Sequence, residues 1–258
     1  MKLSVSIDIL FGKWGETMET EKFLNCMETV KKAGYDGIEF LNWWNVDLDA
    51  VAAKKDELGL EVVTIPTKCE CMGAESEREV FLEDLKKSIE AAHKLGCKAI
   101  FTSAGHERMF LSREVFFDNM IETLKEAGKI LKGQGVTLLI EPVNVKVDHA
   151  GVFPLDAHDA FMMMRVLNDP NIKILFDIYH QQRTDGNILE TIGLNIDRIG
   201  HLHAAADPGR NEIEFSEINY RYIVKEVEKM GYDGYLGMEY SPTMDVYTGL
   251  VRSKELLQ

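Results

Sequence analysis

The chain is poor in cysteine and in positive charge. Four of its 258 residues are cysteines, Cys26, Cys69, Cys71 and Cys97. They are too few for a disulfide scaffold, and no second Cys/His pair completes a zinc site, so we expect reduced thiols. Lys and Arg number 29 against 43 Asp and Glu, which gives a net charge of −14. Because no Lys/Arg-rich run is present, neither nucleic acid nor an anionic membrane is an expected partner.

Long apolar runs and domain linkers are also missing. The N-terminal stretch reaches an acidic residue at Asp8 without the apolar run of a signal peptide or a membrane span. This predicts a soluble, cytoplasmic protein. No segment rich in Pro, Gly and Ser divides the chain, and we expect a single domain over residues 1–258.

Eight short apolar runs recur along the chain, and each is followed by a longer stretch with helical spacing of apolar residues. The runs begin near Leu3, Asp36, Leu60, Cys97, Val136, Ile172, Arg198 and Gly234. Several of the helical stretches end in cations followed by glycine, as at Gly34, Gly96 and Gly231. Repeated βα units in a chain of about 250 residues predict an α/β fold, a (β/α)8 TIM barrel. An open doubly wound sheet is the alternative, but no Gly-x-Gly-x-x-Gly loop follows a strand.

Four adjacent strands of this barrel end in groups that could bind a metal. The expected strands five, six, seven and eight end in Glu141, Asp177, His203 and Glu239. In such barrels the reactive groups lie at the C-terminal ends of the strands. Three converging carboxylates would repel one another unless a cation compensates them. Three oxygen ligands and one imidazole favour Mn²⁺, Co²⁺ or Mg²⁺ over a structural zinc ion.

Two further residues have a less definite role at this stage. His201 lies two residues before His203 and therefore faces the same side of the strand, one layer deeper. It could orient a metal ligand or be an ordinary hydrogen-bonded core histidine. Glu39, in the second strand, could act in the same way or form an ion pair with a helix.

The second half of the chain resembles the hydroxypyruvate isomerase family, which belongs with the ketose 3-epimerases and endonuclease IV to the xylose isomerase-like barrels. The resemblance covers about residues 136–243, and it is vaguer before them. It is carried by Leu139-Ile-Glu141-Pro-Val-Asn144, Phe176-Asp177-Ile-Tyr-His180-Gln-Gln, Gly200-His201-Leu-His203 through Asp207-Pro-Gly-Arg210-Asn-Glu212, Glu217-Ile-Asn219-Tyr220 and Gly237-Met-Glu239-Tyr240-Ser-Pro242.

The resemblance implies roles for individual residues. It makes Glu141, Asp177, His203 and Glu239 the ligands of one divalent metal ion, and Glu141 and Glu239 also the acid/base pair. It places His180 and Arg210 at the substrate. For these two, a core or interface histidine and a rim ion pair with Glu212 are the alternatives without function.

Three departures from the family pattern concern the substrate. Hydroxypyruvate isomerases usually carry Gln where His203 stands, whereas His is typical of the ketose 3-epimerases. A basic residue usually follows their Glu-Tyr-x-Pro motif, but Thr243 follows Pro242 here. The loop at residues 66–73 also lacks the family's usual Pro-Gly-Asp stretch. The missing cation favours a neutral sugar over a carboxylate-bearing substrate.

The expected reaction removes a proton next to a carbonyl. The resulting cis-enediolate needs its charge stabilised, and two carboxylates can remove and return the proton. The sequence thus predicts a metal-dependent isomerase of a sugar or small hydroxy-carbonyl compound, with a ketose 3-epimerase as the alternative. An endonuclease IV-like metallohydrolase and a simple sugar-binding protein are further alternatives. We expect Trp14 to contact the substrate, and the enzyme to be a homo-oligomer.

Overall fold

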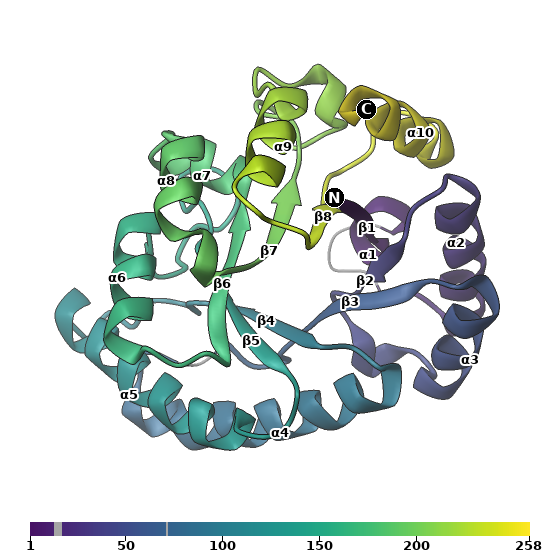
Figure 1. Ribbon diagram of the computed structural model, residues 1–258. Helices are drawn as coiled ribbons and strands as arrows, with labels where there is room; N and C mark the ends of the chain where they lie inside the picture. The colour runs from purple at the N-terminus through teal and green to yellow at the C-terminus, as the bar shows by residue number, and fades with distance from the viewer. Residues whose placement is uncertain (13–16, 71) are drawn as a thin grey trace.

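A closed barrel of parallel strands forms the centre of the molecule (Figure 1). The structure is a computed structural model that describes residues 1–12, 17–70 and 72–258. Each strand pairs with its neighbour in sequence order, and β8 closes the barrel by pairing with β1. The strands are β1 (Lys2–Ser6), β2 (Gly37–Glu39), β3 (Glu61–Pro66), β4 (Ala99–Ser103), β5 (Thr137–Glu141), β6 (Ile172–Asp177), β7 (Ile199–Ala204) and β8 (Tyr235–Met238). The predicted (β/α)8 barrel is confirmed, with a strand in each expected run.

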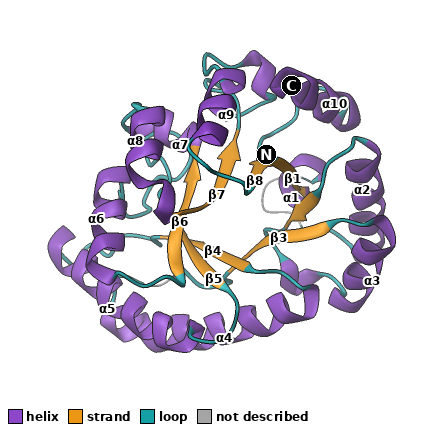
Figure 2. Ribbon diagram, in the orientation of Figure 1, coloured by secondary structure: helices purple, strands orange, loops and turns teal. Residues whose placement is uncertain are grey.

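Helices surround the barrel on its outside (Figure 2). They are α1 (Ile7–Phe11), α2 (Thr20–Lys32), α3 (Leu48–Leu58), α4 (Arg78–Leu95), α5 (Arg113–Leu131), α6 (Ala157–Leu167), α7 (Ile178–Thr184), α8 (Ile188–Asn195), α9 (Tyr220–Lys229) and α10 (Val246–Leu257). Short 3-10 helices occur as η1 (Trp43–Asn45), η2 (Glu75–Glu77), η3 (Ile196–Arg198) and η4 (Ile213–Phe215). Gly34, Gly96 and Gly231 follow α2, α4 and α9 with positive φ angles of 82°, 68° and 94°. This is the left-handed conformation in which a glycine terminates a helix.

The first strand is shorter than the sequence suggests. The apolar run continues to Asp8, but β1 ends at Ser6 and α1 begins at Ile7. Asp8 lies in the first turn of α1, where a carboxylate is favourable. Its Oδ2 atom accepts a hydrogen bond from the backbone N–H of Leu41 at 2.6 Å. The switch to helix therefore also ties the end of β1 to the segment after β2.

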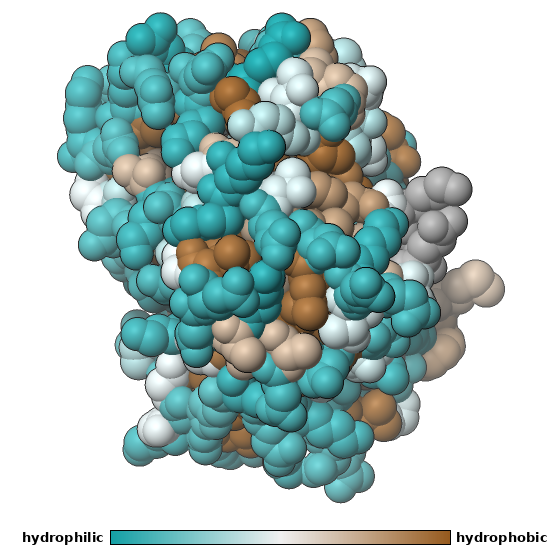
Figure 3. All heavy atoms as spheres, turned by 90° about the vertical axis from the view of Figure 1, so that its right-hand side faces the viewer, coloured by the Kyte–Doolittle hydropathy of each residue, from teal (hydrophilic) through white to brown (hydrophobic). Residues whose placement is uncertain are grey.

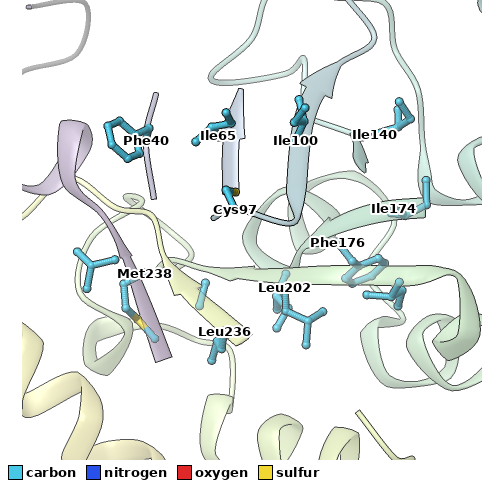
Figure 4. Close-up of a cluster of buried hydrophobic side chains, with 14 of the residues drawn as sticks. Phe40, Ile65, Cys97, Ile100, Ile140, Ile174, Phe176, Leu202, Leu236 and Met238 are labelled. Atoms are coloured by element: carbon cyan, nitrogen blue, oxygen red, sulfur yellow. The ribbon is translucent and has the colours of Figure 1, made fainter. Parts of the chain in front are cut away.

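The main apolar core lies between the strands and the surrounding helices. Alternate residues of each strand face this layer. Figure 4 shows examples from most of the strands and their flanks: Phe40, Ile65, Cys97, Ile100, Ile140, Ile174, Phe176, Leu202, Leu236 and Met238. Hydrophilic residues predominate on the side of the molecule shown in Figure 3. Within the described residues, no helix is long and apolar enough to span a membrane.

The interior of the barrel is more polar than this layer. Phe101, Leu139 and Leu175 form a small separate apolar cluster. The remaining space holds buried polar side chains, including Glu39, His201 and His203. Since parallel strands all end on one side, the last residues of β5 and β6 and the residue after β8 meet at one rim.

Candidate active site

The four predicted ligand residues lie at this rim. Glu141 and Asp177 are the last residues of β5 and β6, His203 lies in β7 and Glu239 follows β8. Asp177 is in register with His203, which in turn is in register with Gly237. All four residues are buried, and the most exposed of them, Glu141, is only 6% exposed. The strand order thus brings together residues that are up to 98 positions apart in the sequence.

Several polar atoms of this group point at one another without a hydrogen bond. Among the described residues, Glu141 Oε1, Asp177 Oδ2, His180 Nε2 and His203 Nδ1 are buried and have no hydrogen-bond partner. His203 Nδ1 lies 3.7 Å from Glu141 Oε1 and 3.7 Å from Glu239 Oε2. Ligand atoms of Glu141, Asp177, His180 and Glu239 lie within 4.8 Å of one another. Unpaired buried carboxylate oxygens at such distances are costly unless a cation or a ligand lies between them.

The two carboxylate oxygens of Asp177 have separate roles. Oδ1 caps the N-terminus of α7, where it accepts hydrogen bonds from the N–H groups of Tyr179 and His180 at 2.7 and 3.2 Å. This cap orients the side chain as the chain turns from β6 directly into α7. The other oxygen, Oδ2, is thereby directed to the cluster, 3.6 Å from His180 Nε2.

A fully hydrogen-bonded layer lies beneath the cluster, around Glu39. His201 Nε2 and His203 Nε2 donate to its two oxygens at 3.0 and 2.8 Å. The hydroxyls of Ser4 and Thr64 donate to them as well. Burial acts to raise the pKa of Glu39, but His201 and His203 hold this pKa well below its usual range. Glu39 is therefore an orienting partner of His203 and does not form an ion pair with a helix.

Glu39 determines which nitrogen of His203 is available. Because Nε2–H donates to the Glu39 carboxylate, Nδ1 is the nitrogen that faces Glu141 and Glu239. A carboxylate behind the ring is the usual partner of a metal-binding histidine, since it fixes the tautomer and the ring orientation. Burial acts to lower the pKa of His203, but Glu39 and Glu239 raise it well above its usual range. In the metal-free protein, a proton on His203 can therefore compensate part of the negative charge.

The carboxyl group of Glu141 has an unusual proton affinity. Burial raises the pKa of Glu141 to about 7. The negative charge of Glu239 also raises this pKa, whereas His203 lowers it. A carboxylic acid with a pKa near neutral pH can both accept and return a proton under ordinary conditions. The structure therefore gives Glu141 the proton affinity that an acid/base group needs.

Arg210 pairs with Glu239 and not with Glu212. Its Nη2 atom donates to Glu239 Oε2 at 2.6 Å, and its guanidinium lies 5.7 Å from the centre of the Tyr179 ring. Glu212 instead accepts hydrogen bonds from the backbone N–H and the hydroxyl of Thr243, both at 2.8 Å. The rim ion pair between Arg210 and Glu212 that the sequence allowed is absent, and Arg210 faces the cluster.

A pocket of about 320 Å³ opens above the cluster. Glu141, Glu239, His180 and Arg210 line it on the side of the cluster. The sequence did not single out the other polar residues of its wall: Glu70, Ser103, His106, Asp148 and His149. Most of them lie in loops without a regular pattern, so no periodicity identifies them. Trp14, the expected substrate contact, lies outside the described residues.

A second cavity, of about 440 Å³, lies at the opposite end of the barrel. Residues at the beginnings of strands line it, among them Glu61, Thr137 and Lys173. Two clusters among the described residues could hold a metal. No residue of the cluster formed by Glu141, Asp177, His180 and Glu239 lines this second cavity. The candidate active site is therefore the pocket at the C-terminal ends of the strands.

Known proteins share the sequence pattern and the fold of this chain. Residues 27–253 match the family described as xylose isomerase-like TIM barrel. The chain belongs to this family. The hydroxypyruvate isomerase of Escherichia coli K12 is 30% identical over an alignment of 260 positions, which covers 97% of this chain and 97% of the relative. The 2-oxo-tetronate isomerase of Pectobacterium atrosepticum is 28% identical over 88% of this chain and 90% of its own. The resemblance inferred from the sequence and the enzyme class, an isomerase, are confirmed.

Several solved structures share the fold of this chain. An AP endonuclease, family 2, from Brucella melitensis superposes with a TM-score of 0.89 at 24% identity, covering 98% of both chains. An L-ribulose 3-epimerase superposes with a TM-score of 0.83 at 18% identity, covering 100% of this chain and 93% of the other. The IOLI protein, solved with a zinc atom, gives a TM-score of 0.76 at 16% identity, covering 99% and 96%. At these identities the likeness concerns the barrel alone.

Proposed function

We propose that the protein is a metal-dependent isomerase of a small hydroxy-carbonyl compound, similar to hydroxypyruvate isomerase, which works by proton transfer through a cis-enediolate held between Glu141 and Glu239. One observation carries the proposal. Two buried glutamates from different strands line the same pocket, and each lies 3.7 Å from the unpaired nitrogen of His203. A protein that only bound a sugar would not need such a pair of carboxylates.

The residues at the rim fit a divalent cation. Glu141, Asp177 and Glu239 offer oxygen atoms, and His203 offers Nδ1 because Glu39 binds its other nitrogen. Oxygen-rich sets with one imidazole suit Mn²⁺, Co²⁺ or Mg²⁺, and the cation would neutralise carboxylates that otherwise repel one another. When bound, such a cation acts as a Lewis acid that stabilises negative charge on the carbonyl oxygen of the substrate.

The two glutamates divide the proton transfer between them. Glu141, with a pKa raised by burial to about 7, removes or returns the proton on one side of the substrate. Glu239 is held by Arg210, which fixes the position of its carboxylate at the pocket wall. His180 Nε2 lies in the same cluster and contacts the substrate. Burial and the charge of Arg210 hold the pKa of His180 well below its usual range, so its ring stays neutral.

An epimerase is the second candidate, and His203 favours it. If one glutamate takes and returns the proton, the product is an aldose–ketose isomer. If the other glutamate delivers the proton from the opposite side, the product is an epimer. Ketose 3-epimerases resemble this chain in having His at the position of His203, and the absence of a basic residue at Thr243 supports a neutral sugar as substrate.

A DNA-cleaving metallohydrolase receives less support. The net charge of −14 opposes binding to a phosphate backbone. Such an enzyme would need further metal ligands from the first half of the barrel. In the two clusters found among the described residues, only Glu39 comes from β1 to β4, and it is hydrogen-bonded to both histidines.

Exchange of the substrate's α-proton with D₂O tests the proposal. Protein loaded with Mn²⁺, Co²⁺ or Mg²⁺ is incubated with hydroxypyruvate and with a panel of neutral ketoses, and deuterium is located by NMR. We expect exchange with at least one ketose, and a loss of about 10²–10⁴-fold in Glu141→Gln and in Glu239→Gln. Glu190→Gln, an exposed carboxylate on α8, is the control and should exchange normally.

The outcome also separates the candidates. Deuterium on the carbon next to the carbonyl with an aldose product supports the isomerase, and an inverted ketose supports the epimerase. Unchanged exchange in both glutamate variants would contradict the proton-transfer pair. Exclusive turnover of hydroxypyruvate would contradict the preference for a neutral substrate that Thr243 suggests.

A further inference from the structure

Asn144 contacts His180, a residue of the pocket wall, and every polar atom of the Asn144 side chain is in use. It is 1% exposed and follows β5 by three residues. Its Oδ1 atom accepts hydrogen bonds from the backbone N–H groups of Val147 and Asp148, at 3.2 and 3.3 Å. Its Nδ2 atom lies 2.7 Å from Asp148 Oδ2 and 2.7 Å from His180 Nδ1.

The orientation of this amide follows from its neighbours. Backbone N–H groups can only donate, so the atom facing Val147 and Asp148 must be the oxygen. A carboxylate can only accept, so the atom facing Asp148 Oδ2 must be the nitrogen. Three contacts therefore agree on one orientation. The NH₂ group of Asn144 then donates to His180 Nδ1. The reversed amide would set its NH₂ group against two backbone N–H groups.

This orientation fixes the tautomer of His180. A nitrogen that accepts a hydrogen bond carries no proton, so Nδ1 is the bare nitrogen and Nε2 carries the proton in the neutral ring. Nε2 is buried, has no hydrogen-bond partner among the described residues and lies in the cluster with Glu141, Asp177 and Glu239. A protonated imidazole nitrogen has no lone pair for a cation, but it can donate to an oxygen atom.

The two histidines at the rim thus have opposite tautomers. In the neutral rings, Glu39 accepts from His203 Nε2, so that only Nδ1 can offer a lone pair, whereas Asn144 donates to His180 Nδ1 and leaves a proton on Nε2. The neutral His203 ring therefore presents a lone pair to the cluster, and the neutral His180 ring presents an N–H group. Distance alone does not separate them, because His180 Nε2 is as close to the carboxylates as a ligand would be.

We infer that Asn144 is a positioning residue that holds His180 as a hydrogen-bond donor to an oxygen atom of the substrate, and so keeps it from binding the cation. The identity of the acceptor, an oxygen atom of the substrate, rests on the proposed function. Asp148 completes the arrangement, because its Oδ2 accepts both from Asn144 and from the hydroxyl of Tyr179, at 2.7 Å each. A fixed donor of this kind needs no reorganisation as negative charge develops on the substrate.

The tautomer can be read directly in the metal-free protein by long-range ¹H–¹⁵N spectra of the histidine rings. His180 is assigned by the signals that disappear in His180→Gln. We expect a bare, pyridine-like Nδ1 and a protonated, pyrrole-like Nε2 in the natural chain. In Asn144→Asp a carboxylate oxygen replaces the NH₂ group, and the two nitrogens should exchange character. Asn195→Asp alters a buried amide far from the pocket and should leave the His180 signals unchanged.

A pyrrole-like Nδ1 in the natural chain would overturn the inference, and so would an unaltered tautomer in Asn144→Asp. If the new carboxylate beside Asp148 prevents folding, Asn144→Ala removes the donor without adding charge. It should then give averaged signals from a mixture of tautomers, and signals like those of the natural chain would contradict the inference.

Kinetics then test the role of the donor. In the assay that shows α-proton exchange, Asn144→Asp should lower kcat/KM by about 10²–10³-fold. Its affinity for Mn²⁺, measured by calorimetry without substrate, should not fall in parallel. A loss of Mn²⁺ affinity in His180→Gln would show that His180 is a ligand and would contradict the inference. The spectra do not depend on turnover, so a protein with the expected tautomer and no exchange would disprove the proposed function and leave the tautomer assignment intact.

Discussion

Two layers of the barrel interior contain the same kinds of residue, but they differ in whether the polar atoms of these residues have hydrogen-bond partners. The lower layer has Glu39 with His201 and His203, and every oxygen of the carboxylate receives hydrogen bonds. The upper layer has three carboxylates and His180, and several of its buried atoms have no partner among the described residues. Both layers are buried. A complete hydrogen-bond set indicates a structural support, whereas unpaired atoms facing one another indicate where a ligand binds.

Among the variants of the two layers, we expect Asp177→Asn in the upper layer to have the largest effect on activity. The amide oxygen can keep the cap on α7, while an NH₂ group replaces Oδ2 in the cluster. We expect activity to fall by about 10²–10⁴-fold, because a cation loses one anionic ligand. The metal-free protein should unfold at the same or a higher temperature, since one of three repelling carboxylates is removed. Calorimetry and an activity assay measure both effects, and a destabilised metal-free variant would contradict this view of the upper layer.

The opposite pattern is expected for Glu39→Gln. This change leaves one histidine N–H facing an NH₂ group in a fully buried layer. We expect the metal-free protein to lose about 3–5 kcal/mol in free energy of unfolding, as for a broken buried ion pair. Affinity for the cation should fall by about 10–100-fold, because His203 loses its orienting partner. Urea denaturation gives the first value and metal titration the second, and a stable variant would show that the lower layer is not a support.

A glycine opposite Glu39 provides a gentler test of the lower layer. A Cβ atom at Gly237 would lie 2.2 Å from Glu39 Oε1 and 2.8 Å from His203 Cδ2. Because Glu39 is held by four donors, Gly237→Ala should cost about 1–3 kcal/mol in unfolding free energy. Gly193→Ala on α8 is the control, since its Cβ would meet nothing closer than 3.4 Å and alanine favours a helix. Equal stability of the two variants would mean that the layer adjusts freely.

The pH dependence of metal binding should reveal the proton on Glu141. Burial raises the pKa of Glu141 to about 7, so the free protein takes up a proton there as the pH falls through 7. A cation must displace this proton in addition to the one on His203, so for each pH unit its affinity should fall about tenfold more steeply below pH 7 than above it. Raising the pH above 7 should remove the dependence on Glu141. Titrations in Glu141→Gln should lack this step, and the same slope in that variant would assign the proton elsewhere.

Much of this arrangement could be predicted from the sequence, because it depends on periodicity and strand order. The eight runs predicted the barrel, and the ends of four consecutive runs predicted that Glu141, Asp177, His203 and Glu239 share a rim. The two-residue spacing of His201 and His203 predicted one common side. Strand ends are set by local patterns, and the closed barrel then fixes which of them are neighbours.

The partners of these residues could not be predicted in the same way. The sequence placed Arg210 at the substrate, with an ion pair to nearby Glu212 as the alternative, but it did not indicate the contact with Glu239, which is 29 positions away. The link between Asn144 and His180 joins a loop to a helix start over 36 positions. Glu39 was ambiguous because a strand residue can face either the interior or the helices, and a register irregularity between Ile38 and Glu39 obscures the alternation. Such contacts depend on loop conformation, which leaves no periodic signal.

Anomalous diffraction from crystals soaked with Mn²⁺ shows in which of the two layers the cation binds. We expect a single strong peak in the barrel, among Glu141, Asp177, His203 Nδ1 and Glu239, with His180 outside bonding distance. A peak between Glu39, His201 and His203, or no peak in the barrel at all, would show that the upper layer is not the metal site.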